Sequence, residues 1–504
     1  MSTIRRQSII SSVVIYLGFA IGFVNTFFFT KDGWFTPEQY GLTSIFVAVA
    51  TLMTSFATMA MPAYIYKFYH YYNDHLSPKK SDMVAWSILL GVIGFILVMV
   101  AGIVFKPLVI RKFGSNSGLF VDYYNWVFPM ALGLTIFTIL ESLAWNMGKS
   151  VLTNFLKEVQ WRAFTTLLIL LFLIGVIGNF DLFIKFYSLG YLVIALTLLA
   201  YLVYTKRIYF YFRVTKITRR FFRKILLFCA FFFSSGIVFN LSQVFDSIVI
   251  ASVLKDGLAK AGVFTLAQLM TSLIQAPQRS IISAAIPHLS RSWKDKNYGN
   301  IQRIYQRSSI NLLLFAAAMY ILILLNYNDA VITFKLNSDY LAGFSAFIFL
   351  GLTRVIDLGT GVNAQIIATS NYWKFELITG IILLGIMLPV NIVMTREFDI
   401  VGPAIANLIG FTLYNAIRVV FLWRKFKFFP FNIRSLYTLL LAGIAFLVSW
   451  LLFRNSSGVG AMVARSATAL VIYGGSALLL RISPDVMPIW QSILERLGLQ
   501  KKKG

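Results

Sequence analysis

The sequence is short of the residues that metal binding and catalysis in water usually require. Among its 504 residues are one cysteine, Cys229, and three histidines, so a disulfide framework is excluded and a thiolate metal site is unsupported. Cys229 stands in an apolar run and is predicted to be a small core residue. No GxxxxGKS/T phosphate loop occurs, which argues against ATP hydrolysis by this chain. We therefore predict no catalytic site, no metal site and no bound cofactor.

Charged residues are also scarce, and acidic ones most of all. Only 13% of the residues are charged and 58% are hydrophobic, against about 25% and 45–50% in soluble domains. A soluble enzyme and a disordered chain are excluded on this ground. The 45 Lys and Arg against 19 Asp and Glu give a net charge of +26. Such an excess suits nucleic acid or an anionic membrane face, and the apolar composition decides for the membrane, without a nucleic-acid partner.

Long apolar runs are abundant. A helix that crosses a bilayer needs about 20 mostly apolar residues, because its backbone polar groups must be satisfied internally. The first run is predicted to be retained rather than cleaved, because no small-residue cleavage site precedes Lys31. The sequence predicts an all-α integral membrane protein with about fourteen spans: 8–30, 41–66, 83–105, 123–146, 160–178, 184–204, 225–251, 261–288, 308–328, 343–368, 374–395, 401–422, 435–453 and 461–481.

The loops between these runs indicate orientation. Lys and Arg favour one set of alternating loops by roughly three to one, and this bias marks the cytosolic side. Both termini are therefore predicted to be cytosolic. No predicted loop is large enough for an extramembrane catalytic domain, so the protein is expected to act within the membrane.

The longest and most basic of the inner loops, 205–224, falls between the sixth and seventh predicted spans. Transporters are often built from two similar bundles, and a linker is needed at this point. We predict a six-helix bundle at 1–204, a basic cytosolic linker at 205–224, a second six-helix bundle at 225–423, and two extra helices with a basic tail at 424–504. Pro62 and Pro287 are predicted to end the second and eighth helices at matched positions.

Several short motifs carry a family resemblance. They are Phe35-Thr36-Pro37-Glu38-Gln39-Tyr40-Gly41-Leu42, Asp246 with Ala261-Gly262-Val263-Phe264-Thr265-Leu266-Ala267, the Pro287 segment, Asp339-Tyr340, and Asp399-Ile400-Val401-Gly402-Pro403-Ala404-Ile405-Ala406-Asn407. With these motifs the sequence resembles the polysaccharide (O-antigen or lipid-linked oligosaccharide) flippases of the multidrug/oligosaccharidyl-lipid/polysaccharide exporter superfamily. The resemblance extends over almost the whole chain.

The resemblance implies two six-helix bundles in a V shape around a central cavity that opens alternately to each side, plus two C-terminal helices. It implies transport of an undecaprenyl-pyrophosphate-linked oligosaccharide to the outer leaflet of the bacterial inner membrane, for lipopolysaccharide or another surface polysaccharide. Expected partners are this substrate, membrane lipids, and the polysaccharide polymerase and glycosyltransferases of the same pathway. A sugar-pyrophosphate head cannot cross hydrocarbon unaided, whereas the polyprenyl tail can stay in lipid.

Charges at bilayer depth are costly, so their presence indicates a polar interior or a functional site. Arg418 and Arg465 lie near span ends and can snorkel to the interface. Seven charged residues of the predicted spans are expected to lie at bilayer depth: Glu141, Asp246, Arg279, Arg354, Asp357, Arg418 and Arg465.

A cavity that binds substrate is predicted from five residues, namely Arg279, Arg354, Asp357, Gln275 and Asn25. Arg279 and Gln275 lie in a polar stretch that Pro277 should break. Arg354 and Asp357 are three residues apart on one helix face. They are either a mutually neutralised pair or a pair in which substrate phosphate competes with the acid for the arginine, whose planar fork suits phosphate.

Two acids are candidates for ion coupling. Asp246 follows Asn240, Ser242 and Gln243 on a polar helix, and it is either a coupling site for an H+ or Na+ gradient or a hydrogen-bonded interior acid. Glu141 lies near the inner end of its helix and is either a gate residue or a charge of the inner surface.

Other functions remain open at this stage. An ion-coupled multidrug antiporter of the same superfamily fits acids in the seventh and tenth helices, but Arg279 and Arg354 would repel cationic drugs. A lipid II flippase often has arginines in its first helices, and here none lies between Arg6 and Arg111. A membrane glycan polymerase or ligase usually has a large outer loop, which the predicted topology lacks.

Overall fold

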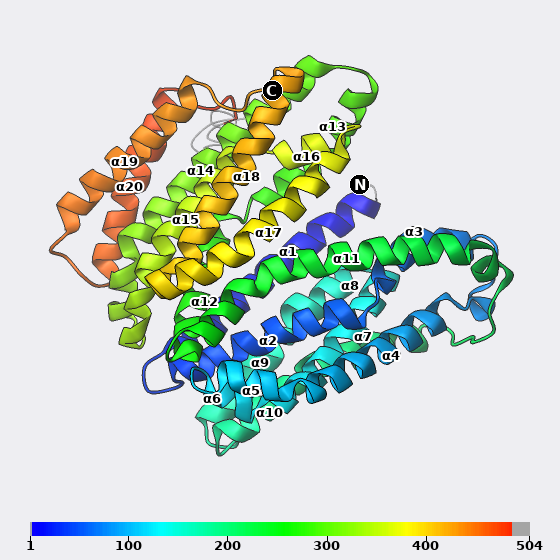
Figure 1. Cartoon of the computed structure of the whole chain (residues 1–504). Helices are drawn as coiled ribbons and strands as arrows, with labels where there is room; N and C mark the ends of the chain where they lie inside the picture. The colour runs from blue at the N-terminus through cyan, green and yellow to red at the C-terminus, as the bar shows by residue number, and fades with distance from the viewer. Residues whose placement is uncertain (1–2, 486–504) are drawn as a thin grey trace. The chain divides into compact units, whose positions relative to one another are not determined.

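The protein is built from α-helices, and the computed structural model describes residues 3–485 (Figure 1). No strand occurs in this described part of the chain. The helices form two compact units, the first ending at Gly262 and the second beginning at Val263. The all-α membrane fold class predicted from the sequence is confirmed.

The first unit is organised around helix α7, which packs against α2, α3, α4 and α10. Helix α1 lies along the segment made by α8, the short π-helix Phe155–Gln160 and α9. The helices of this unit are α1 (Thr3–Thr30), α2 (Pro37–Ala57), α3 (Met61–Asn73), α4 (Met83–Val104), α5 (Lys106–Phe113), α6 (Gly118–Asp122), α7 (Val127–Asn146), α8 (Ser150–Asn154), α9 (Trp161–Leu173), α10 (Phe180–Tyr204) and α11 (Lys216–Val253), with 3-10 turns at Pro78–Lys80 and Tyr124–Trp126.

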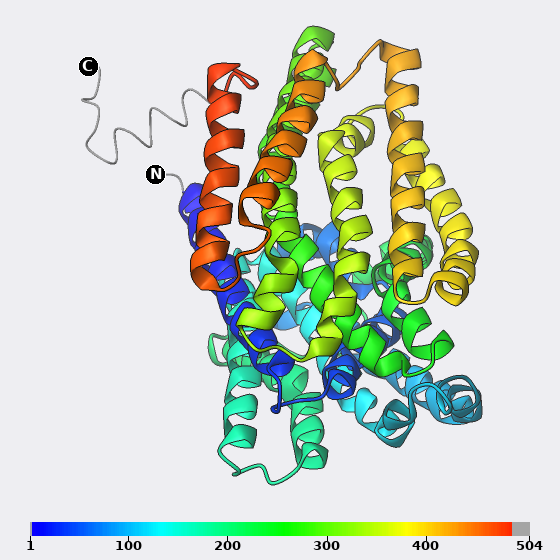
Figure 2. The same cartoon turned by 90° about the vertical axis from the view of Figure 1, so that its left-hand side faces the viewer.

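The second unit contains two connected groups of helices. Helix α18 packs against α15 and α17, while α14 contacts α15, α19 and α20; Figure 2 shows α19 and α20 side by side along α14. The helices are α12 (Gly257–Ile274), which begins in the first unit, α13 (Gln278–Lys294), α14 (Tyr298–Thr333), α15 (Gly343–Gly359), α16 (Asn363–Ala368), α17 (Trp373–Phe398), α18 (Val401–Phe426), α19 (Ile433–Phe453) and α20 (Val459–Leu479), with a 3-10 turn at Ser338–Ala342.

Twelve helical stretches of the described residues are long and apolar enough to cross a membrane. The predicted count of fourteen is not confirmed. One stretch, Lys374–Phe426, contains both α17 and α18. The predicted span 160–178 corresponds to α9, which has only 13 residues because the π-helix precedes it.

Large apolar side chains are exposed on the outer helices, as expected where lipid is the solvent. Leu440 and Leu447 of α19 and Val471 of α20 are 54%, 53% and 72% exposed. A soluble protein would not present such contiguous apolar surface. The chain is a multi-pass membrane protein.

Two predicted spans are interrupted helices. The second is broken between α2 and α3, where Met59 and Ala60 adopt left-handed backbone angles. The eighth is broken between α12 and α13, at the turn formed by 275–277, as Pro277 predicts. The predicted helix end at Pro287 is wrong, because Pro287 lies inside α13, which continues to Lys294.

The compact units do not follow the basic loop 205–224. Helix α11 packs against α2 and α3 and belongs to the first unit, whereas residues from 225 onward were assigned to the second bundle from the sequence. The N-terminus of α11 explains this grouping. Its cap residue Thr215 is hydrogen-bonded to the buried carboxylate of Asp82, at the start of α4. The backbone amide of Thr215 donates to Asp82 Oδ2 at 2.9 Å, and the hydroxyl of Thr215 donates to Asp82 Oδ1 at 2.9 Å.

Two of the motif segments from the sequence meet in the first unit. A Cβ added at Gly41 of α2 would collide with the carbonyl oxygen of Leu258, and one added at Gly262 would collide with that of Pro37. The start of α2 is held by Thr36, whose hydroxyl accepts from the amide of Gln39 at 3.2 Å. The two helices therefore approach closely because both contact positions are glycine.

We predict that Gly41→Ala destabilises the protein by about 1–3 kcal/mol, because the added methyl group overpacks a backbone contact. The measurement is the apparent melting temperature of the detergent-purified full chain. Gly443→Ala in α19 is the matched control, since a Cβ there meets no atom within 4 Å. Equal melting temperatures for Gly41→Ala and the control would contradict the close contact between α2 and α12.

Candidate functional site

Four buried or half-buried polar side chains of the second unit form one hydrogen-bonded network, namely Asp357, Thr360, Asn363 and Asn415. The amide nitrogen of Asn415 donates to Asp357 Oδ1 at 3.0 Å. The amide oxygen of Asn415 accepts from Thr360 at 2.9 Å and from Asn363 at 2.8 Å. Helices α15, α16 and α18 supply these groups. Because each buried amide needs its partners, the network holds three helices in one arrangement.

The carboxylate of Asp357 is held by amides. Besides Asn415, Gln278 donates to its Oδ2 at 3.4 Å from the first turn of α13. Within the described residues Asp357 makes no ion pair, and the guanidinium carbon of Arg354 lies 5.6 Å from the ring centroid of Phe411. The neutralised Arg354–Asp357 pair that the sequence allowed is therefore not formed, although both residues are on α15.

Two other sequence-predicted cavity residues lie close in the chain to Gln278, which bonds Asp357. Gln275 is half-buried in the turn between α12 and α13. Arg279 follows Gln278 in the first turn of α13, but its side chain lies outside the described residues. The turn at Pro277 thus brings the polar stretch of α13 to Asp357.

Arg418 is a buried member of a charge cluster rather than a snorkelling residue. It is 8% exposed, and its Nε donates to Glu376 Oε2 at 2.9 Å while Nη2 bonds the other carboxylate oxygen. Tyr414 donates to the same carboxylate at 3.1 Å, and the guanidinium lies 3.6 Å from its ring centroid. The cluster joins α18 to α17. The sequence analysis missed Glu376, which lies 42 positions from its partner.

Arg465 also has a structural role. From α20 it donates to the carbonyl of Leu325 at 2.6 Å and to that of Ser456 at 2.9 Å. Its Nη2 lies 3.5 Å from Asp329 on α14. Asp329 in turn accepts from the amide of Gly458 at 3.1 Å. Arg465 therefore fastens the last two helices to α14 instead of facing a cavity.

In the first unit, charges gather around the π-helix. Glu141 of α7 is 8% exposed, and its Oε2 lies 3.7 Å from the Nζ of Lys157. A second ion pair joins Glu158 Oε2 to Arg162 Nη2 at 3.1 Å. Lys157 and Glu158 both belong to the π-helix, a rare geometry that is often found at functional sites. The sequence analysis did not single out Lys157, Glu158 or Arg162.

Helix α1 packs tightly against this charged segment. A Cβ at Gly18 would lie 2.6 Å from the carbonyl oxygen of Glu158. Asn25 donates to the carbonyl of Arg162 at 2.8 Å and accepts from Thr166 at 2.6 Å. The amide of Asn25, predicted to line a cavity, is thus used to hold α1 on α9.

The remaining coupling candidate, Asp246, lies on α11 and is 9% exposed. It belongs to the first compact unit, as does Glu141, whereas Arg354 and Asp357 belong to the second. No group of three or more His, Cys, Asp or Glu side chains that could hold a metal ion lies within residues 3–485 as described.

Interrupted apolar helices with charged side chains buried between them are typical of membrane transporters. A family model described as polysaccharide biosynthesis protein matches residues 4–293, more than half of the chain. The chain belongs to this family. No curated protein matches the sequence.

Solved structures share the fold. One is the lipid II flippase MurJ in an inward closed conformation, with 14% identity, a TM-score of 0.73, and coverage of 94% of this chain and 99% of that chain. A multidrug resistance MATE family transporter of the MOP superfamily, inward-facing, has 13% identity, a TM-score of 0.64, and coverage of 82% and 94%. A MOP superfamily transporter from Pyrococcus furiosus has 14% identity, a TM-score of 0.56, and coverage of 84% and 95%. These neighbours are flippases and transporters, and at this identity they establish the fold.

We predict that Arg418→Ala destabilises the protein by about 3–5 kcal/mol, because it leaves the Glu376 carboxylate without its cation inside the helix pair. Replacing both partners, as Arg418→Met with Glu376→Leu, removes the unpaired charge and is expected to restore most of the lost stability. Apparent melting temperatures of the three purified proteins check this. A double variant as unstable as Arg418→Ala would refute the unpaired Glu376 carboxylate as the cause of the lost stability.

Proposed function

We propose that the protein is a flippase that moves an undecaprenyl-pyrophosphate-linked oligosaccharide from the cytosolic to the outer leaflet by alternating access. Membership of the polysaccharide biosynthesis family and the flippase-like fold support this proposal. The observation that carries it is the polar centre of the second unit, where Asp357 is held by the amides of Asn415 and Gln278 on a helix that also carries Arg354.

This centre suits an anionic substrate for a physical reason. An arginine at depth binds phosphate through a planar fork of N–H donors, and each such charge-assisted bond is stronger in a water-poor site. Asp357 is restrained by amides, so an arriving pyrophosphate would not need to displace a salt bridge from that carboxylate. We assign substrate binding to Arg354 and Arg279, with Asp357 and Gln275 orienting the polar stretch.

Coupling to an H+ or Na+ gradient would use Asp246 or Glu141 of the first unit. Lys157 lies beside Glu141, so protonation of that acid would release a lysine whose side chain is 44% exposed. This arrangement fits a gate that opens with proton binding. The polysaccharide polymerase and glycosyltransferases of the pathway are proposed partners.

A lipid II flippase is the second candidate, because the chain covers 99% of the MurJ structure with a TM-score of 0.73. Both substrates carry a polyprenyl pyrophosphate and differ in the sugar. The two functions are separated by rescue of two bacterial strains, one lacking its oligosaccharide flippase and one lacking its lipid II flippase.

We predict that Arg354→Ala and Arg279→Ala each lower surface-polysaccharide production in the rescued strain by about tenfold, the loss expected for one charge-assisted phosphate contact. Arg396→Ala, an exposed arginine at the end of α17, is the control and should retain full rescue. Expression and melting temperature are matched across the variants. Full activity of both arginine variants would rule out the anionic binding centre, and rescue of only the lipid II strain would favour the second candidate.

We further propose that the protein lies in the bacterial inner membrane with both termini cytosolic. In a Cys229→Ala background, a cysteine introduced at Val214 should react with a membrane-impermeant maleimide only after the cells are opened. Val214 is exposed in the segment between α10 and α11, so poor access cannot explain protection in intact cells. Labelling of intact cells would invert the proposed orientation.

A further inference from the structure

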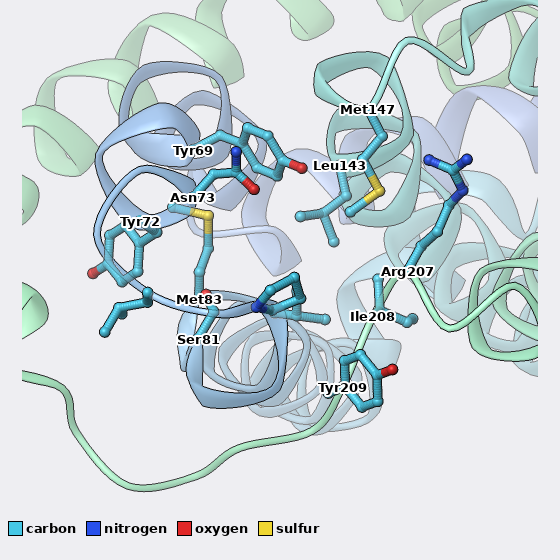
Figure 3. Close-up of a pocket in the computed structure, with 13 residues that line it drawn as sticks. Tyr69, Tyr72, Asn73, Ser81, Met83, Leu143, Met147, Arg207, Ile208 and Tyr209 are labelled. Atoms are coloured by element: carbon cyan, nitrogen blue, oxygen red, sulfur yellow. The ribbon is translucent and has the colours of Figure 1, made fainter.

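The first unit contains a small cavity whose lining includes none of the residues proposed to bind substrate or to couple ions. It has a volume of about 50 Å³, room for roughly three or four water molecules or one phosphate group. The end of α3, the start of α4, the end of α7 and the segment after α10 form its walls (Figure 3). The cavity therefore lies among the ends of four helices, at the end of the unit that carries the loop 205–224.

The cavity is lined by both polar and apolar side chains. Tyr69 and Asn73 at the end of α3 lie on one side of it and Arg207 and Tyr209 on another, with Leu143 and Met147 between them, so that phenol, amide and guanidinium groups line it from two sides (Figure 3). In the described part of the chain, no protein acceptor takes a hydrogen bond from the side chains of those four polar residues. Their donors are available to a ligand.

Arg207 is held at this cavity by its neighbours. Helix α10 ends in a tight cap in which the amide of Arg207 donates to the carbonyl of Leu202 at 3.0 Å. The next residue, Ile208, is 4% exposed and anchors the segment. At its far end, Thr215 is fixed by Asp82, which is fully buried next to the cavity residue Ser81. The segment is thus fastened on both sides of Arg207.

The charge around the cavity is positive. Lys79, Lys80, Lys206 and Arg213 are exposed beside Arg207 in the sequence segments that form it, and the ammonium of Lys79 lies 5.9 Å from the ring centroid of Tyr209. Burial raises the pKa of Tyr69, and the positive charge of Arg207 acts in the opposite direction. Lys79 and Arg207 therefore place cationic charge at the mouth of the cavity, where an anion would be stabilised.

The surroundings favour a lipid over a free anion. Tyr204, Phe210 and Phe212 flank Arg207 and are 88%, 48% and 56% exposed. Exposed aromatic rings next to basic residues at helix ends are typical of the membrane interface, at the level of the headgroups. Basic pockets between helix ends are known to bind anionic lipid headgroups.

We propose that this cavity is a binding site for the phosphate headgroup of an anionic membrane phospholipid. Arg207 binds the phosphate, and the phenols of Tyr69 and Tyr209 and the amide of Asn73 donate to its oxygens. The acyl chains then lie against the exposed rings outside the cavity. The site is independent of the transported substrate.

The test is a titration of the purified full chain with phosphatidylglycerol, followed by native mass spectrometry. Arg207→Ala should weaken lipid binding by about tenfold, as expected for the loss of a charge-assisted contact. Arg213→Ala, which removes an equal charge from the same segment without lining the cavity, should change it less than twofold. Equal weakening by both variants would overturn the proposal in favour of diffuse attraction to a basic surface.

Two further arms complete the test. Inorganic phosphate that displaces phosphatidylglycerol at equal concentration would overturn the assignment to a lipid. If Arg207→Ala does not fold, the double variant Tyr69→Phe with Tyr209→Phe keeps both rings and removes two donors. A loss of about threefold or more in lipid binding supports the site, and unchanged binding overturns it.

Discussion

The structure depends on one constraint, which is that a polar group buried among lipid-exposed helices must find its partner inside the protein. Arg465 meets it with the backbone carbonyl of Leu325 in α14, with that of Ser456 after α19, and with Asp329. Arg418 meets it with the carboxylate of Glu376. Asn415 meets it with a full set of side-chain partners in α15 and α16. Helix positions in the second unit are therefore specified by a few directional bonds, while apolar packing against lipid-like surfaces contributes little specificity.

The family motifs have a packing explanation. Gly41 and Gly262 each occur where helix backbones touch, and Gly402 lies at the tight connection of α17 and α18, where a Cβ would meet the carbonyl of Met394. Thr36 and Gln39 form a capping box that sets the start of α2. These residues determine how helices approach one another, not what is transported. This explains why the motifs identify a fold that flippases and multidrug transporters share, and why they say little about the substrate.

Much of the fold could be predicted from apolar runs, because a membrane-spanning helix can be recognised from the length and the apolar composition of its sequence. The helix break at Pro277 was also visible, since proline removes a backbone donor. The left-handed Met59 and Ala60 carried no such signal, and neither did the π-helix that shortens α9. Pro287 was misread because its position within α13 leaves the helix continuous, as tertiary contacts allow in membrane helices.

The candidate site was predictable only in part, because its partners are distant in sequence. Periodicity placed Arg354 and Asp357 on one face, but Asp357 bonds Asn415, 58 positions away, and Gln278, 79 positions away. A charged side chain within the membrane can be neutralised by an opposite charge, which gives a saturated pair, or it can be hydrogen-bonded by neutral donors. Arg418 and Arg465 are paired with acids, whereas Asp357 is hydrogen-bonded by the neutral amides of Asn415 and Gln278. Saturated pairs resist rearrangement at a cost of several kcal/mol, so a substrate anion would act on the amide-held centre. Arg354 on the same helix as Asp357, and Arg279 next to Gln278 in the chain, are the arginines whose replacement should separate transport from stability.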